Sequence, residues 1–202
     1  MSLAETHRHL RPNPKGVLRW LAVPDESPER LLFERLILAG KDTPLRMNDF
    51  AESLSMSVKD VAKTLFALNR AESVSVRELP PDRHEKGWAS AGLAGLSEEL
   101  ASMTRPGQRI LLSTDDGFQI ARVGCGAYEG DVIAVRQQVE SAAGRLDEGD
   151  GRADLHARLY VAGKGFHLSS SAALDRSHPA WIRLAFRLLN ELAPLRGGER
   201  AC

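Results

Sequence analysis

The stretch LLSTDDGFQIARVG, residues 111–124, predicts a two-stranded antiparallel hairpin and so decides the fold class of the second half of the chain. We expect its strands over residues 109–114 and 118–124, because both segments are strand-like in composition. The Asp-Asp-Gly between them favours a tight turn, since glycine adopts a positive φ without steric cost. A hairpin here is incompatible with a parallel strand–helix–strand unit, so the sequence indicates a mainly antiparallel sheet.

Helices and further strands are expected around this hairpin. Apolar residues recur three and four positions apart before and after it, which is the spacing of an amphipathic helix. Leu155, Leu159 and Val161 alternate with other side chains, as in a half-buried strand. The expected elements are a helix over 96–104, a helix over 129–145, strands over 155–161 and 166–171, and a last helix over 179–192.

The first half of the chain contains a second informative stretch, MNDFAESLSMSVKDVAKTLFALNRAESVSV, residues 47–76. It predicts two helices, over residues 47–54 and 58–70, separated by a short break and followed by a strand. Ser57 is a favourable N-cap for the second of these helices. A preceding helix over residues 29–39 is expected from its apolar spacing and from the glycine that follows it.

The composition is that of a globular protein without a charge bias. The 202 residues are 43% apolar and 27% charged, and 27 basic residues balance 27 acidic ones, so the net charge is zero. No apolar run approaches the roughly 18 residues of a membrane span, and the first residues lack the apolar core of a signal peptide. We therefore expect a cytoplasmic protein with no membrane partner. Arginine outnumbers lysine by 21 to 6, which hints at a GC-rich bacterial gene.

Residues 47–76 resemble a winged-helix or helix-turn-helix unit, and we assign residues 28–79 to such a domain. In DNA-binding members the second helix of the pair enters the major groove. The DNA-binding residues would then be the outward-facing Ser57, Lys59, Lys63 and Thr64. Residues 25–80 carry eight basic and ten acidic residues, whereas a DNA-reading protein usually has a clear basic face. Two alternatives stay open: a DNA-binding domain, or a domain used for protein contact or dimerisation.

Residues 92–195 resemble the Roadblock/dynein light chain family, through the hairpin sequence LLSTDDGFQIARVG and the order of elements around it. The resemblance implies a sheet with helices on both sides, and homodimers built by the long middle helix and an edge strand. It also implies service as a partner or regulator of Ras-like small GTPases. The sequence departs from the family in one respect. The family usually has three strands after the middle helix, whereas we predict two and a candidate stub of a third at Ala172–Leu174.

The expected architecture is α+β: an N-terminal winged helix followed by a Roadblock-like α/β domain, with a mainly antiparallel sheet flanked by helices. Two prolines followed by a charged run make a good linker between the two domains, so we expect the halves to fold independently. Proteolysis is expected to cut first near Arg83 or Lys86. The predicted segments are an N-terminal tail or extension (1–27), the winged-helix-like domain (28–79), the linker (80–91), the Roadblock-like domain (92–195) and a C-terminal tail (196–202).

Dimerisation is expected because the middle and last helices carry more apolar residues than one packed face requires. On the middle helix, Val132, Val135 and Val139 form the main stripe, which is expected to pack on the sheet, while Ile133 lies off it. The middle helix and the strand over 155–161 are expected to meet their symmetry mates. The residues expected near this contact between two copies are Ile133, Gln137 and Tyr160.

No motif carries a persuasive catalytic or metal-binding assignment. The run GCGAYEG, residues 124–130, has glycines like those of a dinucleotide loop, but it follows a hairpin strand and not a parallel one. Cys125 with His156 or His167 as nucleophile and base is set aside, because no spacing supports it. The acidic loop 147–154 lacks the alternation of a calcium loop. We therefore predict a non-enzyme with no cofactor and no metal site.

The sequence as a whole predicts a non-enzymatic homodimeric regulator or adaptor that binds a Ras-like small GTPase or another protein partner. The alternative is a DNA-binding transcription regulator in which the Roadblock-like domain supplies dimerisation or signal input. A basic strip along the helix over residues 58–70 and the strand after it would favour this alternative.

Overall fold

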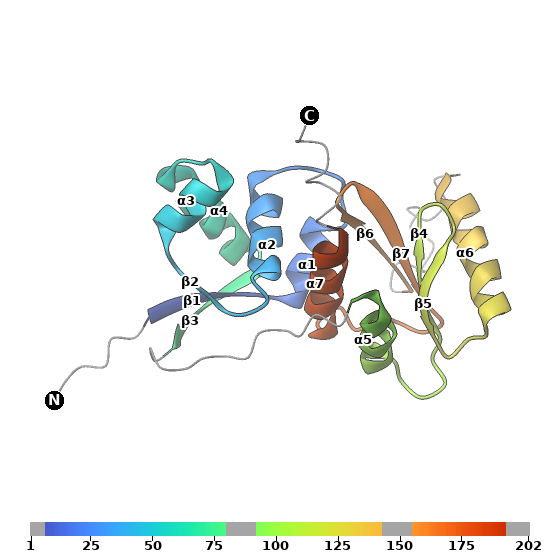
Figure 1. The fold of residues 1–202 in the computed structure, drawn as a ribbon. Coiled ribbons are helices and arrows are strands. Elements are labelled where there is room, and N and C mark those ends of the chain that lie inside the picture. Colours follow the sequence, from blue (N-terminus) through green and yellow to red (C-terminus); the bar gives the residue numbers. More distant parts are fainter. Residues whose placement is uncertain (1–6, 80–91, 143–154, 193–202) are drawn as a thin grey trace.

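The structure is a computed structural model (Figure 1), and it describes residues 7–79, 92–142 and 155–192. Within these ranges the chain forms seven α-helices and two antiparallel sheets, which confirms the mixed α+β class. The expected linker with its cleavage sites, the acidic loop and the C-terminal tail lie outside the described residues.

The N-terminal part is a three-stranded antiparallel sheet with four helices. The strand order is β2–β1–β3, so β1 is central. Helices α3 and α4 have the predicted bounds. Ser55 in the left-handed conformation (φ 53°) ends α3, and the Ser57 side chain accepts the Asp60 N–H at 3.1 Å to begin α4. The elements are β1 (His7–Pro12), α1 (Pro14–Trp20), α2 (Pro28–Leu38), β2 (Thr43–Pro44), α3 (Met47–Leu54), α4 (Val58–Arg70) and β3 (Val74–Leu79).

The N-terminal segment, expected as a tail or extension, contributes the central strand β1 and the helix α1. Strand β1 pairs with β3 along its whole length. Leu10 is buried between more exposed basic neighbours, which is the two-residue period of a strand. Gly16 lets α1 approach α2 closely, since a Cβ there would lie 2.5 Å from the Phe33 ring. This segment therefore belongs to the folded core of the N-terminal part.

The C-terminal part is a four-stranded antiparallel sheet in the order β5–β4–β7–β6, with helices on both faces (Figure 1). Helix α6 packs on β4 and β5, while α5 and α7 pack on the other face. A short 3-10 helix, Leu93–Gly95, leads into α5. The elements are α5 (Leu96–Met103), β4 (Ile110–Thr114), β5 (Gln119–Val123), α6 (Ala127–Ala142), β6 (His156–Val161), β7 (Lys164–Ser170) and α7 (Ala180–Leu192).

The predicted hairpin is present, and Gly117 takes φ 79° in the turn between β4 and β5. Two strands, β6 and β7, follow α6 in the described part of the chain. Ala172–Leu174, the candidate stub of a third strand, is not a strand. The Ala172 carbonyl accepts the side chain of Gln108 at 3.3 Å, and Leu174 is buried in the core. The chain therefore leaves the sheet directly after β7.

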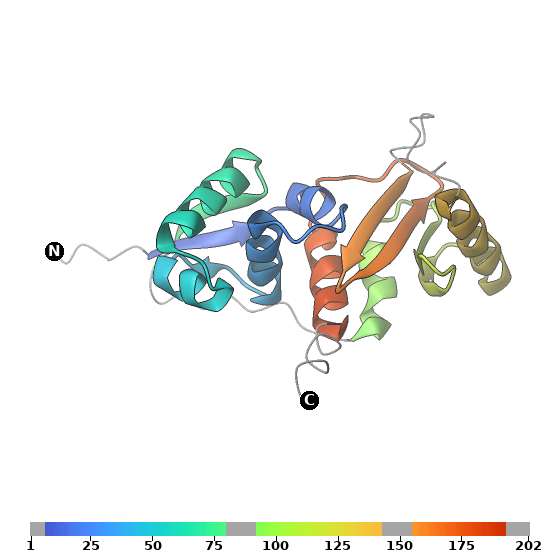
Figure 2. The ribbon, with the colours of Figure 1, turned by 90° about the horizontal axis from the view of Figure 1, so that it is seen from above.

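Helix α7 joins the two parts of the molecule. It packs against α5 on one side and against α1 and α2 on the other (Figures 1 and 2). Trp181 and Leu184 are fully buried, and buried residues of both parts form one hydrophobic cluster. On the α5 side, Glu99 accepts from Arg183 Nε at 2.6 Å and from Arg187 Nη2 at 3.1 Å. These ion pairs hold α7 in the position where both parts contact it.

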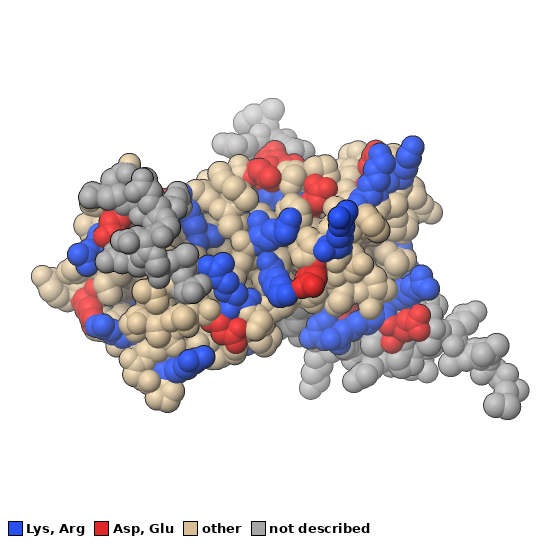
Figure 3. Space-filling view, turned by 180° about the vertical axis from the view of Figure 1, so that it is seen from behind, with Lys and Arg blue, Asp and Glu red and all other residues tan. Residues whose placement is uncertain are grey.

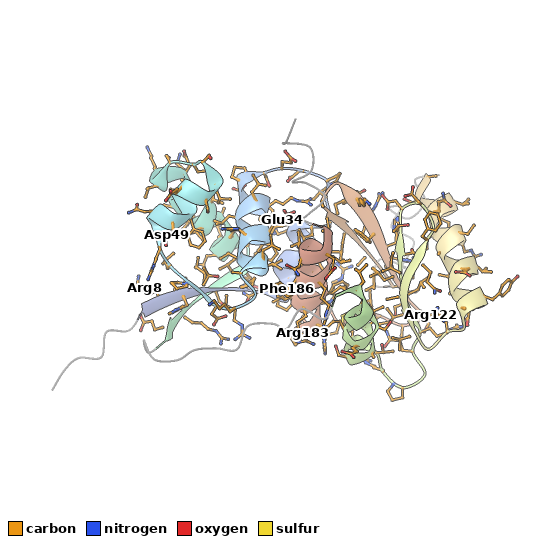
Figure 4. All side chains as sticks on the ribbon, in the orientation of Figure 1. Arg8, Glu34, Asp49, Arg122, Arg183 and Phe186 are labelled. Carbon is orange, nitrogen blue, oxygen red and sulfur yellow. The ribbon has the colours of Figure 1, made fainter. Side chains whose placement is uncertain are left out.

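Hydrogen bonds also cross this junction between β6 and the N-terminal helices. The Tyr160 N–H donates to the Leu21 carbonyl at 2.6 Å, and the Tyr160 carbonyl accepts the buried guanidinium of Arg30. Arg30 Nε also donates to Glu34 at 2.9 Å. Glu34 of α2 and Phe186 of α7 lie at the same junction in Figure 4. The shared core and these bonds lead us to expect that the two parts unfold together, in place of the independent folding predicted from the sequence.

Candidate interaction surfaces

Helix α6 presents a line of large apolar side chains to solvent. Tyr128, Val132, Val135 and Val139 are between 51% and 83% exposed, and their spacings of four, three and four residues place them on one face. We call these four residues the α6 stripe. Phe118, in the turn of the neighbouring hairpin, is also 69% exposed. The valines were expected to pack on the sheet, so the structure reverses the orientation predicted for this helix.

The opposite face of α6 packs on a polar surface of the sheet. Gly130 and Ala134 are buried there, and Gln137 is only 2% exposed. Ser113 Oγ of β4 donates to Gln137 Oε1 at 2.8 Å, and Gln137 Nε2 donates to Ser169 Oγ of β7. A buried amide needs such partners, because an unsatisfied polar group away from water is costly. Gln137 therefore anchors α6 to its own sheet, which explains why the valines face outward.

The three residues expected at the contact between two copies all lie off the α6 stripe. Gln137 is on the sheet-facing side, so it is not available to a second chain. Ile133 is half-buried and lines a cavity of about 310 Å³ between α6 and the sheet. Tyr160 lies at the junction with the N-terminal part, and its ring contacts the Arg158 guanidinium at 4.6 Å. The structure therefore places none of these three residues on the exposed apolar face of α6.

Helix α4 carries the candidate DNA-binding residues, and the structure separates them. Lys59 and Lys63 are exposed, as predicted, whereas Thr64 is 4% exposed and faces the core. Ser57 caps the helix, and its hydroxyl donates to the Asp60 carboxylate at 2.6 Å. Lys63 Nζ also lies 3.4 Å from Asp60. The Ser57 hydrogen bond, followed by that of Lys63, lowers the pKa of Asp60, so this carboxylate stays charged on the outward face.

The outward face of α4 also contains exposed apolar side chains. Phe66 is 68% exposed and Val58 is 45% exposed. On the face of the molecule shown in Figure 3, Lys and Arg side chains are interspersed with Asp and Glu. A large exposed aromatic residue beside one carboxylate and two lysines is a mixed surface, in contrast to the basic strip expected of a DNA reader.

Cys125 does not have the environment of an activated nucleophile. It lines the 310 Å³ cavity together with His156. Burial, followed by the charge of Glu129, raises the pKa of the thiol, which disfavours the thiolate that reacts. Within the described ranges, no three His, Cys, Asp or Glu side chains lie together as a possible metal site.

The glycines of residues 124–130 have local structural reasons. Gly124 adopts φ 74°, and a Cβ there would lie 2.6 Å from the Gln108 carbonyl oxygen. Gly130 lies where α6 crosses β5, and a Cβ there would meet the Gln119 side chain. The strand before them, β5, is antiparallel to its neighbour β4. The glycines thus allow the chain to turn closely from strand β5 into helix α6.

A cluster of one buried histidine and two half-buried charged side chains lies on the same sheet face as Gln137. His167 Nε2 is 2.7 Å from Asp115 Oδ1, and Arg158 Nη2 is 2.9 Å from Asp115 Oδ2. Gly165 makes room for the carboxylate, since a Cβ there would clash with Asp115. Burial lowers the pKa of His167, and the attraction of Asp115 only partly opposes this because Arg158 and His156 also disfavour a positive imidazole.

We expect this histidine to make folding pH-dependent. The folded protein holds His167 neutral, whereas the unfolded chain binds the proton near the ordinary pKa of 6.5. The contribution of the neutral His167 to the unfolding free energy should therefore be complete above pH 6.5. The unfolding free energy should decrease as the pH drops below 6.5, by at most about 1.4 kcal/mol per pH unit. Urea denaturation of the wild type and of His167→Gln between pH 7.5 and about 5 measures the difference. Parallel curves for the two proteins would contradict the assignment.

Comparison of the chain with models of protein families, with curated proteins and with solved structures gave no match. Among the described residues, no helix combines the length and apolarity needed to cross a membrane. The two helices that present large apolar side chains to solvent are α6, on the C-terminal sheet, and α4, in the N-terminal part.

Proposed function

We propose that the protein is a non-enzymatic homodimeric regulator or adaptor that binds a Ras-like small GTPase or another protein partner. The observation that carries the proposal is the α6 stripe. Monomeric proteins rarely leave a continuous line of large apolar side chains in water, and such a line is typical of an interaction site.

The spacing of the α6 stripe favours a second copy of the same chain as its partner. A twofold interface places a surface against itself, so its pattern must be self-complementary. If two α6 helices pack antiparallel about a point between Val132 and Val135, Val132 meets Val135 and Tyr128 meets Val139 of the second copy. The same arrangement places Asp131 opposite the exposed Arg136, so the charges beside the stripe also match.

The GTPase part of the proposal rests on the Roadblock resemblance. That resemblance leads us to expect helices on both faces of an antiparallel sheet, with the long middle helix free to dimerise. The positions of α6 on one face and of α5 and α7 on the other support this reading. So does the outward orientation of the α6 stripe.

Sedimentation equilibrium of the full chain at micromolar concentration tests the homodimer. We expect twice the chain mass of 22.1 kDa. A species of 22.1 kDa over the whole concentration range would overturn the proposal. Binding of purified small GTPases in their GDP and GTP forms, followed by calorimetry, then tests the partner class.

A DNA-binding transcription regulator is the second candidate, because the exposed Lys59 and Lys63 lie four residues apart on one face of α4. If α4 reads DNA, Lys59→Ala/Lys63→Ala should weaken binding and flatten the salt dependence by roughly one unit per lost phosphate contact. Stability should change by less than about 0.5 kcal/mol, since both side chains are exposed. Titration with mixed genomic DNA at low and moderate salt measures both quantities. Tight DNA binding that the double variant leaves unchanged would reject this face.

A further inference from the structure

A cavity of about 510 Å³ lies at the junction of the two parts, and neither proposed function uses it. One wall comes from α1 and the connection that follows it, and the other from β6 and the segment after β7. The first wall is apolar and includes Leu18, Val23 and Pro24, whereas the second includes His156, Arg158 and Arg176. The volume is in the range of small-molecule sites, which combine apolar walls with a few placed polar groups.

The polar wall of this junction cavity is rich in nitrogen donors, and the charge of Arg158 is paired with that of Asp115. Two guanidinium groups and an imidazole line it, and no carboxylate does so among the described residues. Arg158 is held in place from two sides, by Asp115 at 2.9 Å and by the Tyr160 ring at 4.6 Å. Its Nε is buried and has no hydrogen-bond acceptor in the described part of the chain. A pre-organised guanidinium of this kind is suited to an anionic oxygen ligand.

We propose that the junction cavity binds a small organic anion, in which a carboxylate or phosphate head group is attached to an apolar body. The head group pairs with Arg158 and Arg176, and the apolar body contacts Leu18, Val23 and Pro24. The ligand touches both parts of the molecule at once, so its binding stabilises their contact. The inference is independent of the homodimer, because the cavity and the α6 stripe have no residue in common.

The cavity is also connected to the anchor of α6. His156 lines the junction cavity, and its Nδ1 lies 3.0 Å from Ser169 Oγ. Ser169 in turn accepts the side chain of Gln137, which holds α6 on the sheet. A bound anion would therefore contact a side chain that is hydrogen-bonded to the α6 anchor, which gives the site a physical route to the dimerising helix.

Calorimetric titration of the full chain tests the site, with decanoate and octyl phosphate as probes and 1-decanol as the neutral control. We expect saturable binding of at least one anion with a dissociation constant below about 1 mM, at least tenfold tighter than the alcohol, and a rise in melting temperature. Arg176→Gln and Val23→Glu change exposed side chains on the two walls, and each should weaken binding about tenfold or more.

Two matched controls, Arg70→Gln and Val76→Glu, make the same chemical changes at exposed positions outside the cavity and should leave binding unchanged. The unliganded melting temperature of each variant shows that it remains folded. The inference is overturned if neither anion binds saturably, if the alcohol binds equally well, or if the cavity variants bind like their controls.

Discussion

The variant Val135→Glu is expected to convert the proposed homodimer to a monomer. In the proposed antiparallel pairing, residue 135 of each copy packs against Val132 of the other, so the substitution introduces two charges into an apolar contact. Burying an unpaired carboxylate costs several kcal/mol, and even about 3 kcal/mol raises the dissociation constant more than 100-fold. Sedimentation velocity over a concentration series, from micromolar to the highest soluble concentration, measures the change.

A matched substitution shows whether the effect belongs to α6. Val76 on β3 is 48% exposed, close to the 54% of Val135, but it lies in the N-terminal part. Val76→Glu should leave the mass at that of the dimer. Both variants should have the melting temperature of the wild type, apart from the decrease that loss of the dimer causes in Val135→Glu. If the protein stays dimeric with Val135→Glu, the dimer interface lies outside the α6 stripe.

The sequence predicted well those elements that depend on nearby residues. Helix α4 begins at its predicted position because Ser57 and Asp60 satisfy each other within one turn. The hairpin forms around Gly117 because one residue with positive φ closes the turn. In both cases the residues that determine the structure lie within a few positions of each other in the sequence. Composition and spacing are therefore sufficient to predict these elements.

Features that depend on distant partners were not predictable in the same way. Strand β1 has only one large apolar residue, Leu10, and its pairing with both β2 and β3 makes it the centre of a sheet. The direction in which α6 faces depends on the sheet beneath it, where Ser113 and Ser169 receive Gln137. A valine stripe alone predicts an inward face, and the polar sheet surface reverses it. Thr64 was expected to face outward as part of a DNA-reading surface, but its position on α4 places it against the core.

The largest effect on stability is expected for Leu184→Ala. Leu184 is fully buried in α7, the helix on which both parts pack. Truncation of a buried leucine removes apolar contact and leaves a cavity, so we expect a loss of about 3 kcal/mol in the free energy of unfolding. Because the core is shared, the loss should appear in both parts. Urea denaturation gives its size, and hydrogen exchange of the amides in β1 and in β7 gives its distribution.

Leu93→Ala is the matched control, since this leucine is 46% exposed and its truncation should cost less than about 0.5 kcal/mol. If the Leu184→Ala chain does not fold, Leu184→Val removes less volume and serves for the same comparison. Lost protection in β7 with unchanged protection in β1 would show that the parts unfold separately, as the sequence first indicated. Equal losses in both sheets would show that α7 couples them, because β1 and β7 belong to different sheets and share no strand pairing.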